Sequence, residues 1–216
     1  MTTPGVASAA HTRAMGRFVY WMNTSLDLLI EGAVGENGGG DWMRIGERVH
    51  RIFNERATDL ALMVQGRVVY EIMEGFWPAA ATDASQPDYV QEYGTIWTTK
   101  PKVLVSASRS EASHNTRVIG SGGRDATLAA LAEIRAEADG PVGVGGATLA
   151  THLLEAGLLD EMLLFVHPVI LGGGRALFDR VGSRVECDLV EHEALDDGVT
   201  LQRYTIRGAG SSARPA

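Results

Sequence analysis

A glycine pair followed directly by a helix-forming run is the part of this sequence best suited to chemistry. The apolar stretch 142–144 predicts the end of a buried strand, and Gly145 and Gly146 let the backbone turn tightly beside a ligand. Apolar residues then recur at helical spacing, which places Ala147 and Thr148 in the first turn of a helix. Unpaired N–H groups and the positive end of the helix dipole meet there. The pattern therefore indicates a site for a phosphate or pyrophosphate group.

The same junction can be only a tight turn, and its spacing does not fit the common dinucleotide-binding fingerprint. Gly143, Gly145 and Thr148 give G-x-G-x-x-T, where a third small residue is expected. The acidic residues Asp160 and Glu161 open the next apolar run instead of closing it. A nucleotide-binding fold other than the Rossmann fold is therefore indicated.

A series of short motifs along the chain resembles one known family. The motifs are FVYWMNTSLD at 18–27, GRVVYE at 66–71, KVLVSAS at 102–108, GGATLA at 145–150, EAGLLDE at 155–161, HPV at 167–169 and ILGGGRALF at 170–178. Their order resembles the dihydrofolate-reductase-like superfamily, and within it the riboflavin-biosynthesis reductase (RibD C-terminal) family. The resemblance covers about residues 17–207. It implies an α/β three-layer fold with a mainly parallel central sheet, an antiparallel C-terminal hairpin and helices on both faces.

The resemblance also implies NADPH as the cofactor. Three loops that follow strands would hold it, because ligands of open α/β sheets collect beyond the carboxyl ends of the strands. Arg67 and the turn 106–109 would lie near the adenosine 2′-phosphate, where the planar donors of arginine suit phosphate oxygens. An ordinary surface charge at a helix start is the alternative for Arg67, and Val69 replaces a threonine of the family. The expected cofactor residues are Gly66, Arg67, Ser106, Ser108, Arg109, Gly145, Gly146, Ala147, Thr148 and Leu149.

Hydride transfer from a nicotinamide is the chemistry that the resemblance implies, and the substrate then needs a proton as well. Asp27 matches the aspartate of the family's S-L-D motif and is the expected catalytic residue; capping of a turn is its alternative role. Leu28 replaces the family's usual glycine, and Val144 stands where the riboflavin reductases commonly have a glutamate. The second departure weakens the expectation of the riboflavin intermediate as substrate and leaves the fold and cofactor unaffected.

Four residues are expected at the substrate. His167, Gly173 and Phe178 belong to motifs that lie near the substrate pocket in this fold, and Glu47 is on a predicted helix that lines the pterin pocket of folate enzymes. The alternatives are a hydrogen-bonded core histidine for His167 and a solvated helix face for Glu47. No histidine, cysteine and carboxylate spacing suits a metal site, and the single Cys187 cannot supply the ligand set of a zinc deaminase.

The sequence supports three readings of function. The first is an NADPH-dependent reductase acting on a flat pyrimidine- or pterin-like heterocycle, with 5-amino-6-(5-phosphoribosylamino)uracil reduction in riboflavin biosynthesis as the family activity. The second is a non-catalytic homodimer that binds a nucleotide. The third is a dihydrofolate or pteridine reductase. The loops around 31–40 and 77–100 would choose the substrate, and no sequence pattern specifies their conformation.

Composition agrees with one enzyme-sized domain. The chain has 216 residues, of which 45% are hydrophobic and 21% charged, enough for a sizeable core. One cysteine excludes internal disulfides and fits a reducing, cytoplasmic compartment. The formal net charge of −8 argues against nucleic-acid binding, and no apolar stretch has transmembrane length. We expect a disordered leader at 1–16, a single reductase-like domain at 17–207 and a disordered tail at 208–216.

Hydrophobic periodicity predicts strands that alternate with helices. The predicted strands are 17–24, 60–65, 102–106, 116–119, 142–144, 161–167 and a closing hairpin of 184–194 with 199–207. The predicted helices are 43–57, 66–73, one capped by Asp125 and one after Gly146. Segment 31–40 is expected to be a mobile loop, and 77–100 a long excursion with one helical turn at most, around 88–93. Alternating apolar residues in 184–194 predict one buried face and an edge that a homodimer would cover.

Overall fold

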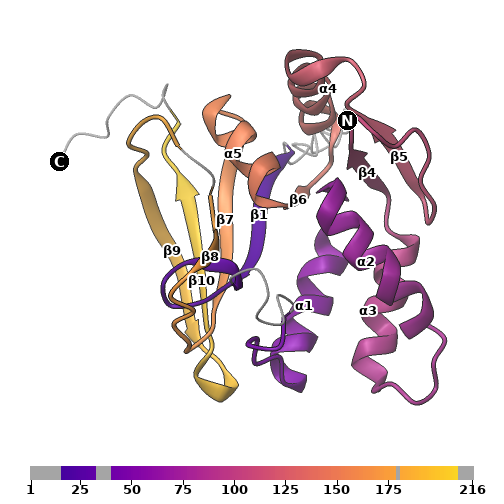
Figure 1. Ribbon diagram of the computed structural model, residues 1–216, viewed down its shortest axis with the longest axis vertical. Helices are drawn as coiled ribbons and strands as arrows, with labels where there is room; N and C mark the ends of the chain where they lie inside the picture. Colours follow the sequence, from indigo (N-terminus) through magenta and orange to yellow (C-terminus); the bar gives the residue numbers. More distant parts are fainter. Residues whose placement is uncertain (1–15, 33–39, 179–180, 209–216) are drawn as a thin grey trace, which may run out of the picture.

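Short apolar runs separated by amphipathic helices form an eight-stranded sheet with the order β5-β4-β3-β6-β1-β7-β10-β9 (Figure 1). The computed structural model describes residues 16–32, 40–178 and 181–208. Its strands are β1 Arg17–Thr24, β2 Leu29–Gly32, β3 Leu62–Gly66, β4 Lys102–Val105, β5 Thr116–Ile119, β6 Pro141–Gly145, β7 Leu159–Val166, β8 Gly174–Ala176, β9 Cys187–Ala194 and β10 Thr200–Ile206. Its helices are α1 Glu47–Asp59, α2 Arg67–Ala80, α3 Asp88–Thr99, α4 Gly123–Glu137, α5 Ala147–Glu155 and the 3-10 turn η1 Asp196–Gly198.

The sheet is parallel from β5 to β7 and antiparallel at its C-terminal end, where β10 pairs with β7 and β9 pairs with β10. Helices α4 and α5 cover one face, because Leu131 and Leu153 belong to the same buried cluster as Phe18 and Val64. Helices α1, α2 and α3 cover the other face. Their buried contributions are Val49, Phe53, Ala57, Tyr70, Tyr93 and Trp97. These layers confirm the predicted fold class.

Strand β6 lies in the middle of the sheet and has side chains of very different size on its two faces. Val142 and Val144 point into the core under α4 and α5. Gly143 and Gly145 face the other helix layer, and a Cβ atom added to Gly143 would lie 2.6 Å from Leu60 Cδ1. Leu60 therefore packs directly onto Gly143, and both glycines line a pocket between the sheet and helices α1 and α2.

The segment 77–100 differs most from its prediction. Helix α2 continues to Ala80 although it contains Pro78, and α3 occupies 88–99 where one helical turn at most was expected. Pro78 lies in the last turn of α2, so the i−4 hydrogen bond that it cannot donate is lost near the end of the helix and no long helical stretch follows it. The Trp77 and Tyr93 rings pack 4.4 Å apart and Trp97 is fully buried. Packing between the two helices stabilises them where the local sequence pattern is weak.

Two smaller boundaries also differ from the prediction. Helix α1 begins at Glu47 and not at residue 43, and α4 begins at Gly123 after the cap residue Gly122. Asp125 is therefore not the predicted cap residue. It lies inside the first turn, where its negative charge interacts favourably with the positive end of the helix dipole. The helix after Gly146 and the glycine at its end, Gly157 with φ of +67°, match the prediction. The expected leader, the expected tail and most of the expected loop 31–40 lie outside the described residues.

Strand β9 is the edge of the sheet. The prediction that one of its faces is buried is wrong within this single chain. None of its residues is buried, and Leu189 and Val190 are 50% and 46% exposed. The pairing with β10 shifts between Arg203 and Tyr204, opposite Val190, as expected for a β-bulge. An edge strand with exposed apolar residues needs a cover. The homodimer stays a prediction that this edge supports.

We expect the protein to be a dimer that closes over β9. Light scattering at micromolar concentration should give twice the mass of one 23.1 kDa chain. Val190→Lys should shift that mass toward the monomer, because a charge buried at an interface without a partner is costly. Val68→Lys is the matched control, since Val68 is also 46% exposed but lies on α2. A monomeric wild type, or equal effects of both variants, would contradict the prediction.

Candidate cofactor and substrate site

The loops expected to hold the cofactor leave neighbouring strands at one end of the sheet. In the strand register Gly66 lies beside Val105, and Gln65 lies beside Gly145. The turn at Ser106, the start of α2 at Arg67 and the glycine pair are therefore adjacent at the carboxyl ends of β4, β3 and β6. This is the edge where open α/β sheets bind ligands.

The glycine pair forms the turn into α5 by a backbone conformation that only glycine adopts readily. Gly146 has a φ of +110° and is the cap residue of α5, and no side chain caps this helix. A Cβ atom on Gly145 would lie 3.1 Å from Val69 Cγ1. Ala147 and Leu149 are buried and Thr148 is exposed. The first-turn N–H groups of α5 are thus left for an anionic ligand.

Arg175 reaches the same helix start, and the sequence reasoning gave it no role. Arg175 lies on β8, and its Nη2 atom donates a hydrogen bond to Thr148 Oγ1 at 2.8 Å. The residue stands in the quoted motif ILGGGRALF, so the motif was the signal that could have identified it. The contact adds a positive charge to the end of α5 that already favours anions.

Arg67 is the first residue of α2, a helix that also has a glycine cap residue and no side-chain cap. Its guanidinium is 47% exposed, and Nη1 donates to Glu71 Oε2 at 2.6 Å. A half-exposed ion pair one helical turn apart contributes little free energy. Arg67 can therefore leave Glu71 for a stronger anion at small cost.

The turn after β4 is held by its own serine. Ser106 is buried, and its Oγ atom accepts hydrogen bonds from the N–H groups of Ser108 and Arg109 at 3.2 and 3.0 Å. Arg109 Nη1 pairs with Glu74 Oε2 at 2.9 Å, and the hydrogen bond from Arg109 lowers the pKa of Glu74. Ser106 thus shapes the turn, whereas Arg109 is engaged by a carboxylate.

Asp27 ties two loops together. Its Oδ1 atom accepts a hydrogen bond from Ser25 Oγ at 2.6 Å and another from the Leu171 N–H at 3.1 Å, and its Oδ2 atom accepts from the Gly172 N–H at 2.8 Å. The Ser25 hydroxyl and these backbone donors lower the pKa of Asp27 to about 2. A carboxyl group with that pKa holds no proton near neutral pH. The geometry favours the turn-capping role over the proton donor.

His167 is fully buried and joins the ends of β7 and β1. Its Nδ1 atom accepts a hydrogen bond from the Arg44 N–H at 2.9 Å, so the proton is on Nε2, which lies 3.0 Å from Asn23 Oδ1. Burial and the nearby charge of Arg44 lower the pKa of His167 to about 4. The imidazole is therefore neutral, and it orients the Asn23 amide.

The hollow on the helix side of β6 is an apolar pocket of about 360 Å³. It opens between β1, β3, β6, α1 and α2, and Gln65 and Gly145 connect it to the cofactor loops. The described residues that line it include no charged side chain. They are Trp21, Met22, Asn23, Met43, Ile45, Phe53, Leu60, Met63, Gln65, Val69, Ile72, Met73, Phe76, Trp77, Tyr93, Gly143, Val144 and Gly145.

None of the four residues expected at the substrate lines this pocket. Glu47 is on the exposed side of α1 and pairs with Arg51 at 2.8 Å, which agrees with the solvated helix face. Phe178 packs against Tyr20 at 5.4 Å in the core on the far side of the sheet. A Cβ atom on Gly173 would meet nothing within 4 Å. His167 does not line the pocket, but it is hydrogen-bonded to Asn23, which does.

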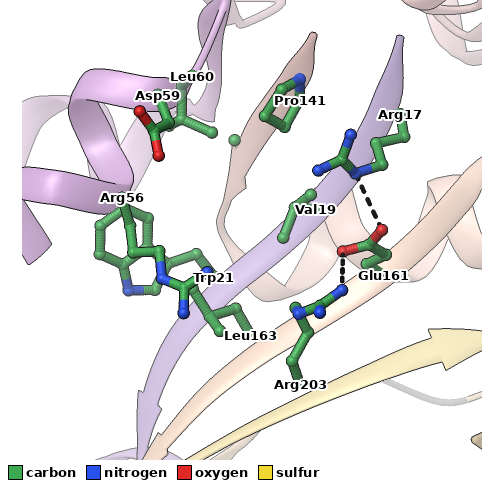
Figure 2. A pocket seen from close by; sticks show the side chains of 11 residues that line it. Arg17, Val19, Trp21, Arg56, Asp59, Leu60, Pro141, Glu161, Leu163 and Arg203 are labelled. Carbon is green, nitrogen blue, oxygen red and sulfur yellow. Dashed lines mark hydrogen bonds and ion pairs between the residues drawn. The ribbon is translucent and has the colours of Figure 1, made fainter. Parts of the chain in front are cut away.

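A second pocket lies at the opposite end of the sheet, near the amino ends of β1 and β6 (Figure 2). Glu161 stands between Arg17 at 2.9 Å and Arg203 at 3.3 Å, as the dashed lines in Figure 2 show. Arg56 pairs with Glu191 beside them. These arginines are paired with carboxylates, so the cluster is a structural ion-pair network and does not offer free positive charge to an anion.

Residues 16–32, 40–178 and 181–208 contain no group of three or more His, Cys, Asp or Glu side chains that could hold a metal ion. Within the same ranges no helix is both long and apolar enough to cross a membrane.

Comparison with known proteins identifies relatives over most of the chain. The model of the RibD C-terminal domain family matches residues 19–201. The uncharacterized protein YyaP of Bacillus subtilis (strain 168) is 26% identical over 193 residues, which are 89% of this chain and 96% of that protein. Both the family resemblance and its extent agree with the sequence motifs.

Solved structures share the fold. A "putative riboflavin biosynthesis protein" of Shewanella sp. PV-4 aligns with a TM-score of 0.66 and 21% identity over 88% of this chain and 99% of its own. The deaminase/5-amino-6-(5-phosphoribosylamino)uracil reductase of Thermotoga maritima gives 0.57 and 15% over 91% of this chain and 58% of its own. Dihydrofolate reductase of Enterococcus faecalis, complexed with NADP(H), gives 0.55 and 12% over 88% and 96%. These matches confirm the predicted dihydrofolate-reductase-like fold.

The contacts of Asp27 generate a pH-dependent prediction. Asp27→Asn should lower the melting temperature at pH 7, because the charged acceptor of three hydrogen bonds is lost. A folded-state pKa of about 2 against an ordinary 3.8 means that the stabilisation is present above pH 4 and disappears as the pH falls toward 2. Melting curves of both proteins from pH 7 to 2 should therefore converge at low pH. A turnover loss of roughly 10²–10⁴-fold without a change in melting temperature would instead identify a general acid.

Proposed function

This chain belongs to the RibD C-terminal domain family, and from that premise we propose that it is an NADPH-dependent reductase of a flat heterocycle. The main support for the proposal is that the three loops expected to hold the cofactor lie next to an apolar pocket. Gln65 and Gly145 belong to both, so a dinucleotide lying across β4, β3 and β6 would end at the pocket. Bound NADPH would supply the hydride, and the chain would supply orientation and the exclusion of water.

The residues of the edge fit the cofactor. Two neighbouring helices, α2 and α5, begin without side-chain caps, and Gly146 adopts a φ that brings backbone N–H groups toward a ligand. Thr148 and Arg175 add a hydroxyl and a cation at the start of α5. These groups would hold the pyrophosphate. Arg67 would hold the adenosine 2′-phosphate, with the Ser106 turn beside it.

The pocket supports reduction more than the other readings of the sequence. Trp21, Phe53, Trp77 and Tyr93 give it flat walls of a kind that pack against an aromatic ring. A non-catalytic nucleotide-binding protein has no use for a second, apolar pocket beside the cofactor. A folate-type reductase would need a carboxylate at the ring, and Glu47 is turned to solvent. The pocket therefore favours the reductase, and the proton for the reduced substrate would come from water.

Arg67 provides the test of cofactor preference. Arg67→Ala should weaken NADPH binding by roughly 10- to 100-fold and leave NADH almost unchanged, since a hydrogen bond to a charged group contributes roughly 1.5–3 kcal/mol. Glu71→Gln should tighten NADPH, because it removes the competing carboxylate. Nicotinamide fluorescence titration measures both constants. Equal losses for the two cofactors would show that Arg67 serves the shared pyrophosphate, and a wild type without preference would remove the 2′-phosphate site.

Arg175 gives the complementary test on the shared part of the cofactor. Arg175→Met keeps an unbranched apolar stem and removes the guanidinium charge, so NADPH and NADH should both weaken by about tenfold. Arg184→Met is the control, because Arg184 is 88% exposed, pairs with Glu186 and lies outside the loops expected to hold the cofactor. Unchanged binding of both cofactors to the Arg175 variant would exclude this residue from the pyrophosphate site.

A further inference from the structure

The floor of the apolar pocket contains one buried acceptor that has no partner. Gln65 is 5% exposed and lines the pocket at the end of β3, and its Oε1 atom is buried without a hydrogen bond. An unsatisfied buried carbonyl oxygen costs free energy, which a hydrogen bond from a ligand would recover. The position therefore suits a ligand that brings an N–H group.

A donor lies across β6 from that acceptor. Asn23 lines the pocket from the end of β1, and its Oδ1 atom is engaged by the Nε2–H of His167. Because the amide oxygen faces His167, the amide nitrogen is the atom that Asn23 offers elsewhere. The Arg44 N–H fixes the imidazole from its other side at 2.9 Å. This relay holds Asn23 in one orientation.

The remaining surroundings are apolar. Glycines at 143 and 145 make the floor flat between Asn23 and Gln65, and aromatic rings such as Trp21 and Trp77 stand around it. A charged group entering this space would lose its hydration without gaining a counter-charge from the described lining residues. A phosphate would be disfavoured strongly, since it carries about two charges.

We propose that the substrate half of this site takes an uncharged, flat lactam-type heterocycle, whose N–H is recognised by Gln65 and whose carbonyl oxygen is recognised by Asn23. Phosphorylated ribosyl-pyrimidines are excluded. The inference rests on the proposed reductase function for its chemistry, but binding of the ring depends only on the pocket. It assigns this chain a substrate class different from the phosphoribosyl compound in the name of the Thermotoga maritima enzyme.

Calorimetric titration of the full chain without cofactor tests the proposal with three probes. 2-Quinolone is an uncharged bicyclic lactam, 1-methyl-2-quinolone lacks only its N–H, and uridine 5′-monophosphate carries a pyrimidine with a phosphate. We expect 2-quinolone to bind about tenfold more tightly than its methyl derivative, as one hydrogen bond to a buried acceptor predicts. Uridine 5′-monophosphate should bind at least tenfold more weakly than 2-quinolone. Equal or tighter binding of the nucleotide, or no binding of either quinolone, overturns the proposal.

Gln65→Leu isolates the acceptor. The variant should bind both quinolones equally and should melt at the same or a higher temperature, because an unsatisfied buried polar atom has been removed. Gln91→Leu, the same change on α3 outside the pocket, should keep the tenfold preference. A lower melting temperature with the preference retained would make Gln65 a structural residue and overturn its role.

A parallel titration with NADPH separates this inference from the proposed function. NADPH binding with no quinolone binding leaves the reductase reading intact and removes the lactam pocket. Quinolone binding with no NADPH binding does the reverse. If Gln65→Leu weakens NADPH and leaves the quinolone preference unchanged, Gln65 recognises the nicotinamide carboxamide and the substrate assignment fails.

Discussion

The missing side chains on one face of β6 are the constraint on which the site depends. A central parallel strand is normally packed on both faces, and β6 obeys this rule only where Val142 and Val144 enter the core. On the other face, Gly143 and Gly145 have no side chains, and the space above them is a pocket beside Leu60 and Val69 at the strand's carboxyl end. The same run of glycines continues into Gly146 and the start of α5. One short segment therefore lines the apolar pocket and forms the turn into α5, the two parts that the proposed function would assign to a ring and a phosphate.

The sequence predicts best those features that are decided locally. Strands β1 and β5 have the bounds that their apolar runs predict, and the glycine pair marks the start of α5. Leu28 is informative in the same way. It stands where the family resemblance implies a glycine, and its φ of +57° is a conformation that favours glycine. Motifs that depend on backbone conformation therefore predicted the fold and the position of the loops expected to hold the cofactor.

The remaining features depend on contacts between distant residues. Helix α3 has a modest local pattern and is stabilised by Trp97, which is buried against Tyr70 at 5.6 Å between ring centroids. The pocket is assembled from side chains of several elements, so strand register and helix packing had to be known before Gln65 could be placed in it. Asp27 could be found by its motif, but its role could not. The motif does not show that backbone N–H groups donate hydrogen bonds to both of its carboxylate oxygens.

Methionine supplies a large part of the pocket wall, and this gives the wall a property that the rings and glycines lack. Met43, Met63 and Met73 reach it from three different segments. A thioether chain has three rotatable bonds and a polarizable sulfur, so it changes rotamer where a branched side chain would clash. The backbone frame is fixed while its lining deforms. Each methionine that a ligand orders would lose conformational entropy, so such a wall would accept a range of ring outlines at the expense of tightness for any one of them.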